Sequence, residues 1–208
     1  MSKHHFSFKE AFVFGWNKTK QHYWFSFLTF LIVAIITSSV ESVPILSTIV
    51  GFLIALSITY VSLLVARDHH FDFSSLIEPI LSPKKVTKLL ILGAIYMLFA
   101  IIVGTLLYLV PARWFSLLII APAIFVMVRF HFFTYTLVDN ENDSIQELIK
   151  KSYKLTDKHF FMLFAFLILI VLLNVAGALL FLVGLVVTVP VSVFSSAYVY
   201  NRLKEHSI

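Results

Sequence analysis

Three polar side chains are candidates for chemistry because each lies within or next to an apolar stretch: Arg129, Glu147 and Asn174. Arg129 is the most informative, since its neighbours on both sides are apolar. A basic side chain near the middle of a bilayer costs about 2.5 to 3.5 kcal/mol on insertion scales, so it usually faces the interior of a helical bundle. In that position its chemistry would be contact with an anion or a lipid phosphate.

A structural role for Arg129 is the simpler interpretation. A long Arg side chain extends toward the aqueous phase or pairs with a carboxylate, and the acidic candidates are Glu10, Asp139 and Glu147. Asn174 lies in a later apolar run, where an amide more often joins two helices than binds a ligand. Arg129, Glu147 and Asn174 are therefore binding hypotheses whose surroundings decide between the two roles.

The other acids, bases and nucleophiles form no recognisable catalytic pattern. The chain has no Cys, which excludes disulfides, Cys nucleophiles and thiolate metal sites. It has no G-x-x-x-x-G-K-[ST], G-x-S-x-G or H-E-x-x-H motif, and its eight His residues have no carboxylate-supported spacing. We therefore predict no catalytic residues, no metal site and no cofactor. An enzyme would need His and carboxylate side chains to converge in space.

The composition indicates which elements must position these residues. Of the 208 residues, 60% are hydrophobic and only 13% are charged, and the mean hydropathy is +0.94. These values lie far outside the range of soluble domains. Because a bilayer core of about 30 Å needs about 20 helical residues, each long apolar run is a candidate membrane span.

Six such runs follow one another in a single domain covering residues 1–208. They are Tyr23 to Val40, Pro44 to Ala66, Lys88 to Leu109, Phe115 to Val138, about Phe160 to Ala176, and about Leu185 to Tyr200. Every Asp and Glu falls outside the apolar interior of these runs. The sequence thus predicts an all-α integral membrane protein whose two termini lie on the same side.

The basic residues indicate which side that is, because Lys and Arg in short loops stay cytoplasmic. With the N-terminus inside, the inner segments contain 14 of the 16 Lys and Arg residues. These are Lys3, Lys9, Lys18, Lys20, Arg67, Lys84, Lys85, Lys88, Lys150, Lys151, Lys154, Lys158, Arg202 and Lys204. Gaining or losing one span would destroy this asymmetry, so both termini are predicted to be cytoplasmic.

Three inner segments resemble one another: FSFKEAFVFGWNKTKQHYW from Phe6, FDFSSLIEPILSPKKVTKL from Phe71 and DSIQELIKKSYKLTDKHFF from Asp143. Each precedes two apolar runs, which predicts three parallel hairpin repeats of about residues 5–67, 71–138 and 143–202, each preceded by an amphipathic interfacial helix. The alternative is that any two helices on a membrane surface share such a pattern. Pro79 and Pro83 interrupt the second segment, where only two helical turns are expected.

The third segment has the clearest amphipathic pattern. Ile145, Leu148, Ile149 and Tyr153 recur at spacings of three and four, which predicts a helix lying in the membrane interface. The residues expected at the lipid interface, in this and neighbouring segments, are Trp16, Trp24, Lys150, Lys151, Lys154 and Lys158. Their natural partners are membrane lipids, with anionic headgroups on the cytoplasmic leaflet, rather than nucleic acid.

The C-terminal part also resembles a known group of bacterial proteins. The stretch RFHFFTYTLVDNENDSIQELIKKSYKLTDKHFFMLFAFLILI, followed by NVAG and GLVVTVPVSVFSSAYVY, is similar to the uncharacterised YciC-type inner-membrane family and to the membrane domain fused to some glycerophosphodiester phosphodiesterases. It departs from the pattern at Leu148, where Ala is usual, and at Asp157 and Lys158, where Gly is common. The resemblance implies a bacterial cytoplasmic membrane, but it brings no activity and no catalytic residues with it.

Three functions stay open on this basis. The first is a non-enzymatic membrane protein with a structural, lipid-interacting or accessory role, whose protein partners the sequence does not specify. The second is a small transporter or exporter of an amphipathic or anionic solute, which needs a cavity that reaches Arg129. The third is a membrane-embedded enzyme, which the absence of an acid, base or metal-ligand pattern disfavours.

Overall fold

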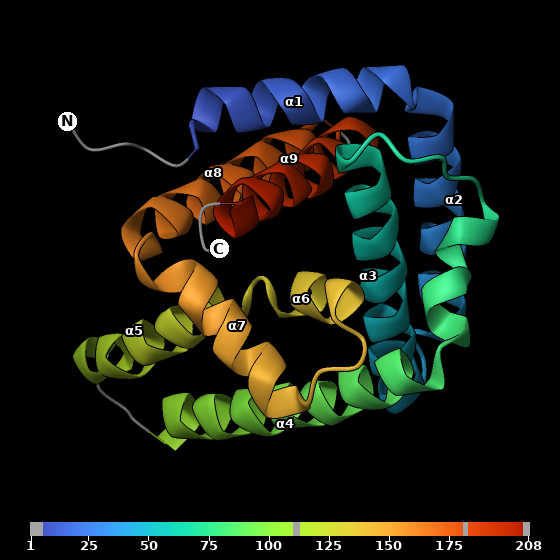
Figure 1. Ribbon diagram of the computed structural model, residues 1–208. Coiled ribbons are helices and arrows are strands. Elements are labelled where there is room, and N and C mark those ends of the chain that lie inside the picture. The colour runs from blue at the N-terminus through green and yellow to red at the C-terminus, as the bar shows by residue number, and fades with distance from the viewer. Residues whose placement is uncertain (1–5, 110–112, 181–182, 206–208) are drawn as a thin grey trace.

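The computed structural model describes residues 6–109, 113–180 and 183–205, except for the side chains of residues 113–117. All regular structure in these ranges is helical (Figure 1). In chain order the elements are α1 (Phe8–Gln21), α2 (Tyr23–Val40), α3 (Pro44–Ala66), η1 (Ser74–Leu76), η2 (Glu78–Leu81), α4 (Pro83–Leu109), α5 (Arg113–Phe130), α6 (Phe133–Asp139), α7 (Ile145–Asp157), α8 (Phe160–Leu179) and α9 (Leu185–Glu205).

Five of the six predicted runs correspond to helical stretches that are long and apolar enough to cross a membrane. Among the described residues these are Tyr23–Val40, Pro44–Ala66, Pro83–Leu109, Leu118–Asp139 and Phe160–Leu179. The sixth run forms α9, which does not belong to this set. Its serines and its charged C-terminal end lower the hydropathy, and much of α9 is buried against other helices. Five candidate spans are thus observed, and a sixth crossing stays a prediction.

The fourth candidate span is interrupted by a turn that the sequence does not signal. Helix α5 continues through Pro122 and ends at Phe130. The chain turns at His131 and Phe132 and resumes as α6. This turn directs two adjacent rings into different parts of the core: Phe132 packs in the cluster around Tyr200, and Phe133 packs with Leu137. Burial of both rings therefore accompanies the break.

Helix α9 lies at the centre of the fold and α1 packs along it (Figure 1). The contact is close because α1 places small residues on this side, namely Ala11, Gly15 and Thr19, all of them buried. Ser195 of α9 donates a hydrogen bond to the carbonyl of Ala11 at 2.9 Å. A Cβ atom at Gly15 would lie 2.5 Å from the Val191 carbonyl oxygen. Glycine is therefore required where the two helices meet.

Helix α7 packs its most buried residues against other helices. Leu148, Ser152, Leu155 and Thr156 are buried, and α7 contacts α5, α6 and α8. Tyr153, which we assigned to the apolar stripe, is 44% exposed. The buried face of α7 therefore includes Ser152 and Leu155 rather than Tyr153, and an interfacial position for this helix stays a prediction.

The elements before the three helical hairpins differ in kind. α1 precedes α2 and α3, and α7 precedes α8 and α9, whereas the segment before α4 forms only the short 3-10 helices η1 and η2. Pro79 lies at the start of η2 and Pro83 starts α4. Proline lacks the N–H that a helix interior requires, which limits the length of this segment as expected.

Candidate functional site

The most highly connected polar group in the described structure is Asp139, the last residue of α6. Its carboxylate accepts hydrogen bonds from Arg67 Nη1 at 2.7 Å and Arg67 Nη2 at 2.8 Å, which makes a bidentate ion pair. Lys204 Nζ donates at 2.7 Å and the Tyr200 hydroxyl at 3.0 Å. Asn201 completes the group, because its Oδ1 accepts from Arg67 Nε at 3.2 Å. We call Arg67, Asp139, Tyr200, Asn201 and Lys204 the Asp139 cluster.

The Asp139 cluster joins the C-terminal ends of three helices. Arg67 follows α3, Asp139 ends α6, and Tyr200, Asn201 and Lys204 lie in the last turns of α9. The Asp139 side chain is only 6% exposed, whereas those of Arg67 and Lys204 are 31% and 39% exposed. The hydrogen bond to Asp139 raises the pKa of the Arg67 guanidinium. One shielded carboxylate therefore holds two partly hydrated cations.

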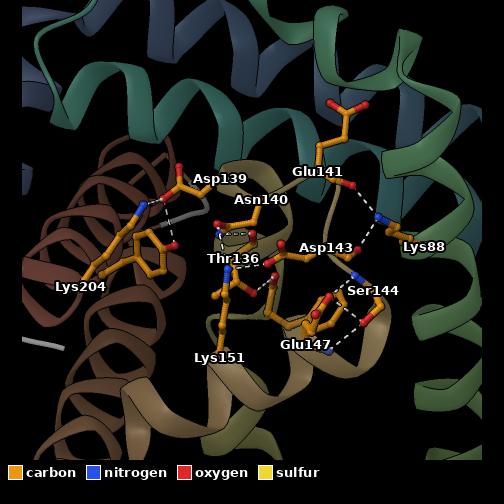
Figure 2. Close-up of polar contacts among 12 residues, drawn as sticks. Lys88, Thr136, Asp139, Asn140, Glu141, Asp143, Ser144, Glu147, Lys151 and Lys204 are labelled. Carbon is orange, nitrogen blue, oxygen red and sulfur yellow. Dashed lines mark hydrogen bonds and ion pairs between the residues drawn. The ribbon is translucent and has the colours of Figure 1, made fainter. Parts of the chain in front are cut away.

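The connection from α6 to α7 is fixed by side chains from other helices (Figure 2). Lys88 of α4 donates to the carbonyl oxygens of Glu141 and Asp143. Lys85 pairs with the Glu141 carboxylate at 3.3 Å, and Ser82 donates to it at 2.6 Å. The Ser82 hydrogen bond is the main cause of the lowered pKa of Glu141. These bonds satisfy backbone carbonyls that would otherwise lack partners in a turn.

Glu147 contacts the start of its own helix and not Arg129. Its carboxylate accepts hydrogen bonds from the Ser144 backbone N–H at 2.7 Å and from the Ser144 hydroxyl at 2.8 Å. The Glu147 N–H in turn donates to Ser144 Oγ at 3.3 Å, which completes a capping box. The backbone hydrogen bond from Ser144 is the main cause of its lowered pKa. Ser144 thus caps α7, and Glu147 has a structural role there.

Arg129 is enclosed by aromatic rings and one carboxylate. It is 7% exposed, and its guanidinium carbon lies 4.3 Å from the ring centre of Tyr153, 4.9 Å from Phe125 and 5.4 Å from Phe160. Its Nη1 is 2.9 Å from Asp157 Oδ1, although Nη1 and Nε make no aligned hydrogen bond within the described residues. Its acidic partner is thus Asp157, and not Glu10, Asp139 or Glu147 as considered from the sequence.

Asn174 joins two helices, as its commoner role predicts. Its Nδ2 donates to Ser192 Oγ of α9 at 2.9 Å and to the Ile170 carbonyl at 2.9 Å. Its Oδ1 is buried without a hydrogen-bond partner in the part of the chain described. The three binding candidates from the sequence are therefore not brought together: Glu147 caps α7, Arg129 pairs with Asp157, and Asn174 bonds α8 to α9.

The residues assigned to the lipid interface lie at the molecular surface. Trp16 is 46% exposed and Trp24 is 72% exposed, and Lys20 lies 5.0 Å from the Trp16 ring centre. The α7 lysines and the adjoining Lys158 are exposed as well; these are Lys150, Lys151, Lys154 and Lys158. Lys151 differs from the others, because its Nζ also donates to Asn140 Oδ1 at 3.1 Å and pairs with Asp143.

Several cavities lie among the described residues, and one of about 530 Å³ adjoins the Asp139 cluster at Arg67, Asn201 and Lys204. A basic pocket of about 300 Å³ is lined by Thr136, Asn140, Lys151, Lys154, Leu155, Tyr200 and Lys204. A larger apolar cavity of about 1070 Å³ lies among α3, α4, α5, α6 and α8, and its few polar lining groups include Thr48, Tyr96, His131 and Thr134. Arg129 lines neither the basic pocket nor the apolar cavity. Within the described residues no three His, Asp or Glu side chains are grouped as metal ligands would be, and the absence of a metal stays a prediction.

Sequence reasoning missed the Asp139 cluster and the basic pocket. Arg67, Asp139 and Lys204 each follow an apolar run within a few residues, and this shared position was the signal that could have paired them. Comparisons of the chain with protein-family models, with curated proteins and with solved structures give no match. The candidate site is therefore defined by its own geometry.

Proposed function

We propose that the protein is a polytopic protein of the cytoplasmic membrane that binds membrane lipids and has a structural or accessory role rather than an enzymatic one. The observation that carries this proposal is the apolar cavity of about 1070 Å³. It exceeds the range of about 300 to 1,000 Å³ usual for small-molecule pockets. Its lining is almost entirely aliphatic and aromatic, which suits acyl chains.

The architecture proposed for this function has six spans in three parallel hairpins, with both termini cytoplasmic. The Asp139 cluster supports it, because the second helices of the three hairpins end together there. The proposed cytoplasmic face has exposed lysines on and beside α7 that attract anionic headgroups, each by about 1 kcal/mol. Membership of the YciC-type family is part of the proposal and is supported by the sequence resemblance alone.

The test fills the cavity and measures retained lipid. Ala55 of α3 and Ala100 of α4 both line it, so Ala55→Phe and Ala100→Phe should lower the amount of phospholipid that co-purifies in mild detergent. Ala34→Phe is the matched control, because Ala34 is exposed on α2 and does not line the cavity. Lipid is quantified per protein by mass spectrometry. Equal retention in all three variants would refute the cavity as a lipid site.

A transporter of an amphipathic solute is the second candidate, and the same cavity favours it. The cavity offers Tyr96, His131 and Thr134 as hydrogen-bonding groups, and His131 Nε2 is buried without a partner in the described structure. Among the described residues, no Lys, Arg, Asp or Glu lines the cavity, which disfavours an anionic solute. Uptake or efflux of a neutral amphipathic dye by reconstituted vesicles, lost in Ala100→Phe, would support transport over lipid binding alone.

A further inference from the structure

We propose that the basic pocket between α6, α7 and α9 binds a phosphate monoester group, presented either by a lipid headgroup or by a small soluble molecule. The pocket is separate from the apolar cavity and shares none of its lining residues. Its volume of about 300 Å³ lies at the lower end of the range for small-molecule sites. It therefore admits a headgroup-sized ligand and not a lipid chain.

The pocket combines three ammonium groups from two helices. Lys151 and Lys154 come from α7 and Lys204 from α9. Figure 2 shows Lys151 and Lys204 directed toward the start of the α6–α7 connection from different sides. Ammonium groups bind phosphate as point charges, without the planar geometry that a carboxylate shares with Arg. A compact anion of high charge suits three such groups best.

The charges around the pocket do not cancel. Asp139 faces both Arg67 and Lys204, and Asp143 faces Lys151. Lys154 has no hydrogen-bond or ion-pair partner in the described residues. Lys151 and Lys204 thus each face a carboxylate whereas Lys154 does not in the part of the chain described, so positive charge is concentrated where Lys154 meets the pocket. Mutual repulsion of the lysines decreases when an anion binds between them.

The back of the pocket is held rigid by buried residues. Thr136 and Tyr200 are each 1% exposed, and both are fixed by hydrogen bonds, to the Phe133 carbonyl and to Asp139 respectively. Asn140 accepts from Lys151 and donates to the Thr136 carbonyl, so it orients Lys151. A fixed wall and a lysine that is already oriented lower the ordering cost of binding.

The expected position of the pocket across the membrane suits a lipid headgroup. Asp139 is the last residue of the fourth candidate span, so the pocket adjoins the level at which a span leaves the hydrocarbon region. This source of the phosphate rests on the proposed membrane function, whereas a soluble phosphate does not. The two sources are therefore tested in separate arms.

The experiment uses the full-length protein and the variants Lys154→Gln, Lys154→Arg and Lys150→Gln. Lys150 is the matched control, since it is exposed on the same helix but does not line the pocket. One arm titrates inorganic phosphate and glycerol 3-phosphate into detergent-solubilised protein by calorimetry. The other measures, by native mass spectrometry, binding of phosphatidic acid against phosphatidylcholine in nanodiscs.

We expect Lys154→Gln to weaken phosphate binding about tenfold, the loss of one charge-assisted hydrogen bond, while Lys154→Arg and Lys150→Gln keep it. Selective binding of phosphatidic acid alone identifies the headgroup as the source, and binding of the soluble phosphates identifies a soluble ligand. Equal weakening by Lys150→Gln and Lys154→Gln, or no preference for phosphate in the unchanged protein, overturns the proposal. Ala55→Phe and Ala100→Phe lie outside α7, so they should leave phosphate binding unchanged. Failure of the lipid-retention test can therefore be distinguished from failure of the phosphate test.

Discussion

Asp139→Asn tests whether the Asp139 cluster holds the ends of three helices together. The substitution keeps the size of the side chain and removes its charge. Arg67 and Lys204 then face an amide that can accept from one of them but whose NH₂ group points donors at the other. The change therefore removes the carboxylate charge that Arg67 and Lys204 share at a shielded position.

The magnitude follows from the exposure of the three partners. Breaking a buried ion pair by removing one partner costs about 3 to 5 kcal/mol. Asp139 is 6% exposed, but Arg67 and Lys204 are 31% and 39% exposed and recover part of their hydration. We therefore expect a loss at the lower end, about 3 kcal/mol in the free energy of unfolding. Exposed pairs contribute only about 0 to 1 kcal/mol.

Asp143→Asn supplies the matched comparison. Asp143 also pairs with a lysine, Lys151, but the two side chains are 27% and 48% exposed, so its loss should stay below about 1 kcal/mol. Both variants are unfolded reversibly in mixed micelles with increasing sodium dodecyl sulfate and followed by circular dichroism. If Asp139→Asn is no less stable than Asp143→Asn, the cluster does not hold the three ends together and the reasoning fails.

Three further predictions concern packing, a polar bond and pH. Gly15→Ala should lower stability by about 1 to 3 kcal/mol through overpacking against α9. Gly104→Ala, whose Cβ would meet nothing within 4 Å, should instead gain up to about 1 kcal/mol in helix propensity. Equal melting temperatures of the two variants would contradict this prediction. Asn174→Ala should cost about 0.6 kcal/mol, and a double-mutant cycle with Ser192→Ala isolates the bond. Burial lowers the pKa of His22 below 6.5. The free energy of unfolding should therefore decrease as the pH falls from 6.5 through the lowered pKa of His22, because the unfolded chain binds the proton more readily. This decrease should be smaller in His22→Asn.

The helices could be predicted from the sequence wherever interactions between residues close in the sequence determine them. Long apolar runs must be helical in a bilayer, so the five candidate spans are found close to their predicted limits. The capping box at Ser144 and Glu147 was also predictable, because both residues lie within one turn. The charge asymmetry grouped Arg67, Lys88, Lys151 and Lys204 on one side. Arg67 and Lys204 contact Asp139 at the end of α6, and Lys88 and Lys151 contact the α6–α7 connection.

Partners distant in the sequence could not be predicted in the same way. Arg129 had several acidic candidates, and the choice of Asp157 depends on how α7 turns its buried face against α5. The turn at His131 and Phe132 has no glycine or proline, so no local signal marks it. In both cases the outcome depends on the packing of rings, such as Tyr153 over Arg129, which a one-dimensional pattern does not contain.

The Asp139 cluster bears on the proposed repeat more directly than sequence similarity does. Any two amphipathic helices share an apolar stripe, so likeness between the segments at Phe6 and Asp143 is weak support. An apolar stripe does not explain why residues at the ends of the second helices should lie together. Arg67 and Lys204 nevertheless both contact Asp139. Three hairpins that are parallel and equivalent would bring these ends together at one face. Alternating spans without any repeat would also place these ends at one face, so the contact is compatible with a threefold arrangement, and the repeat itself stays a prediction.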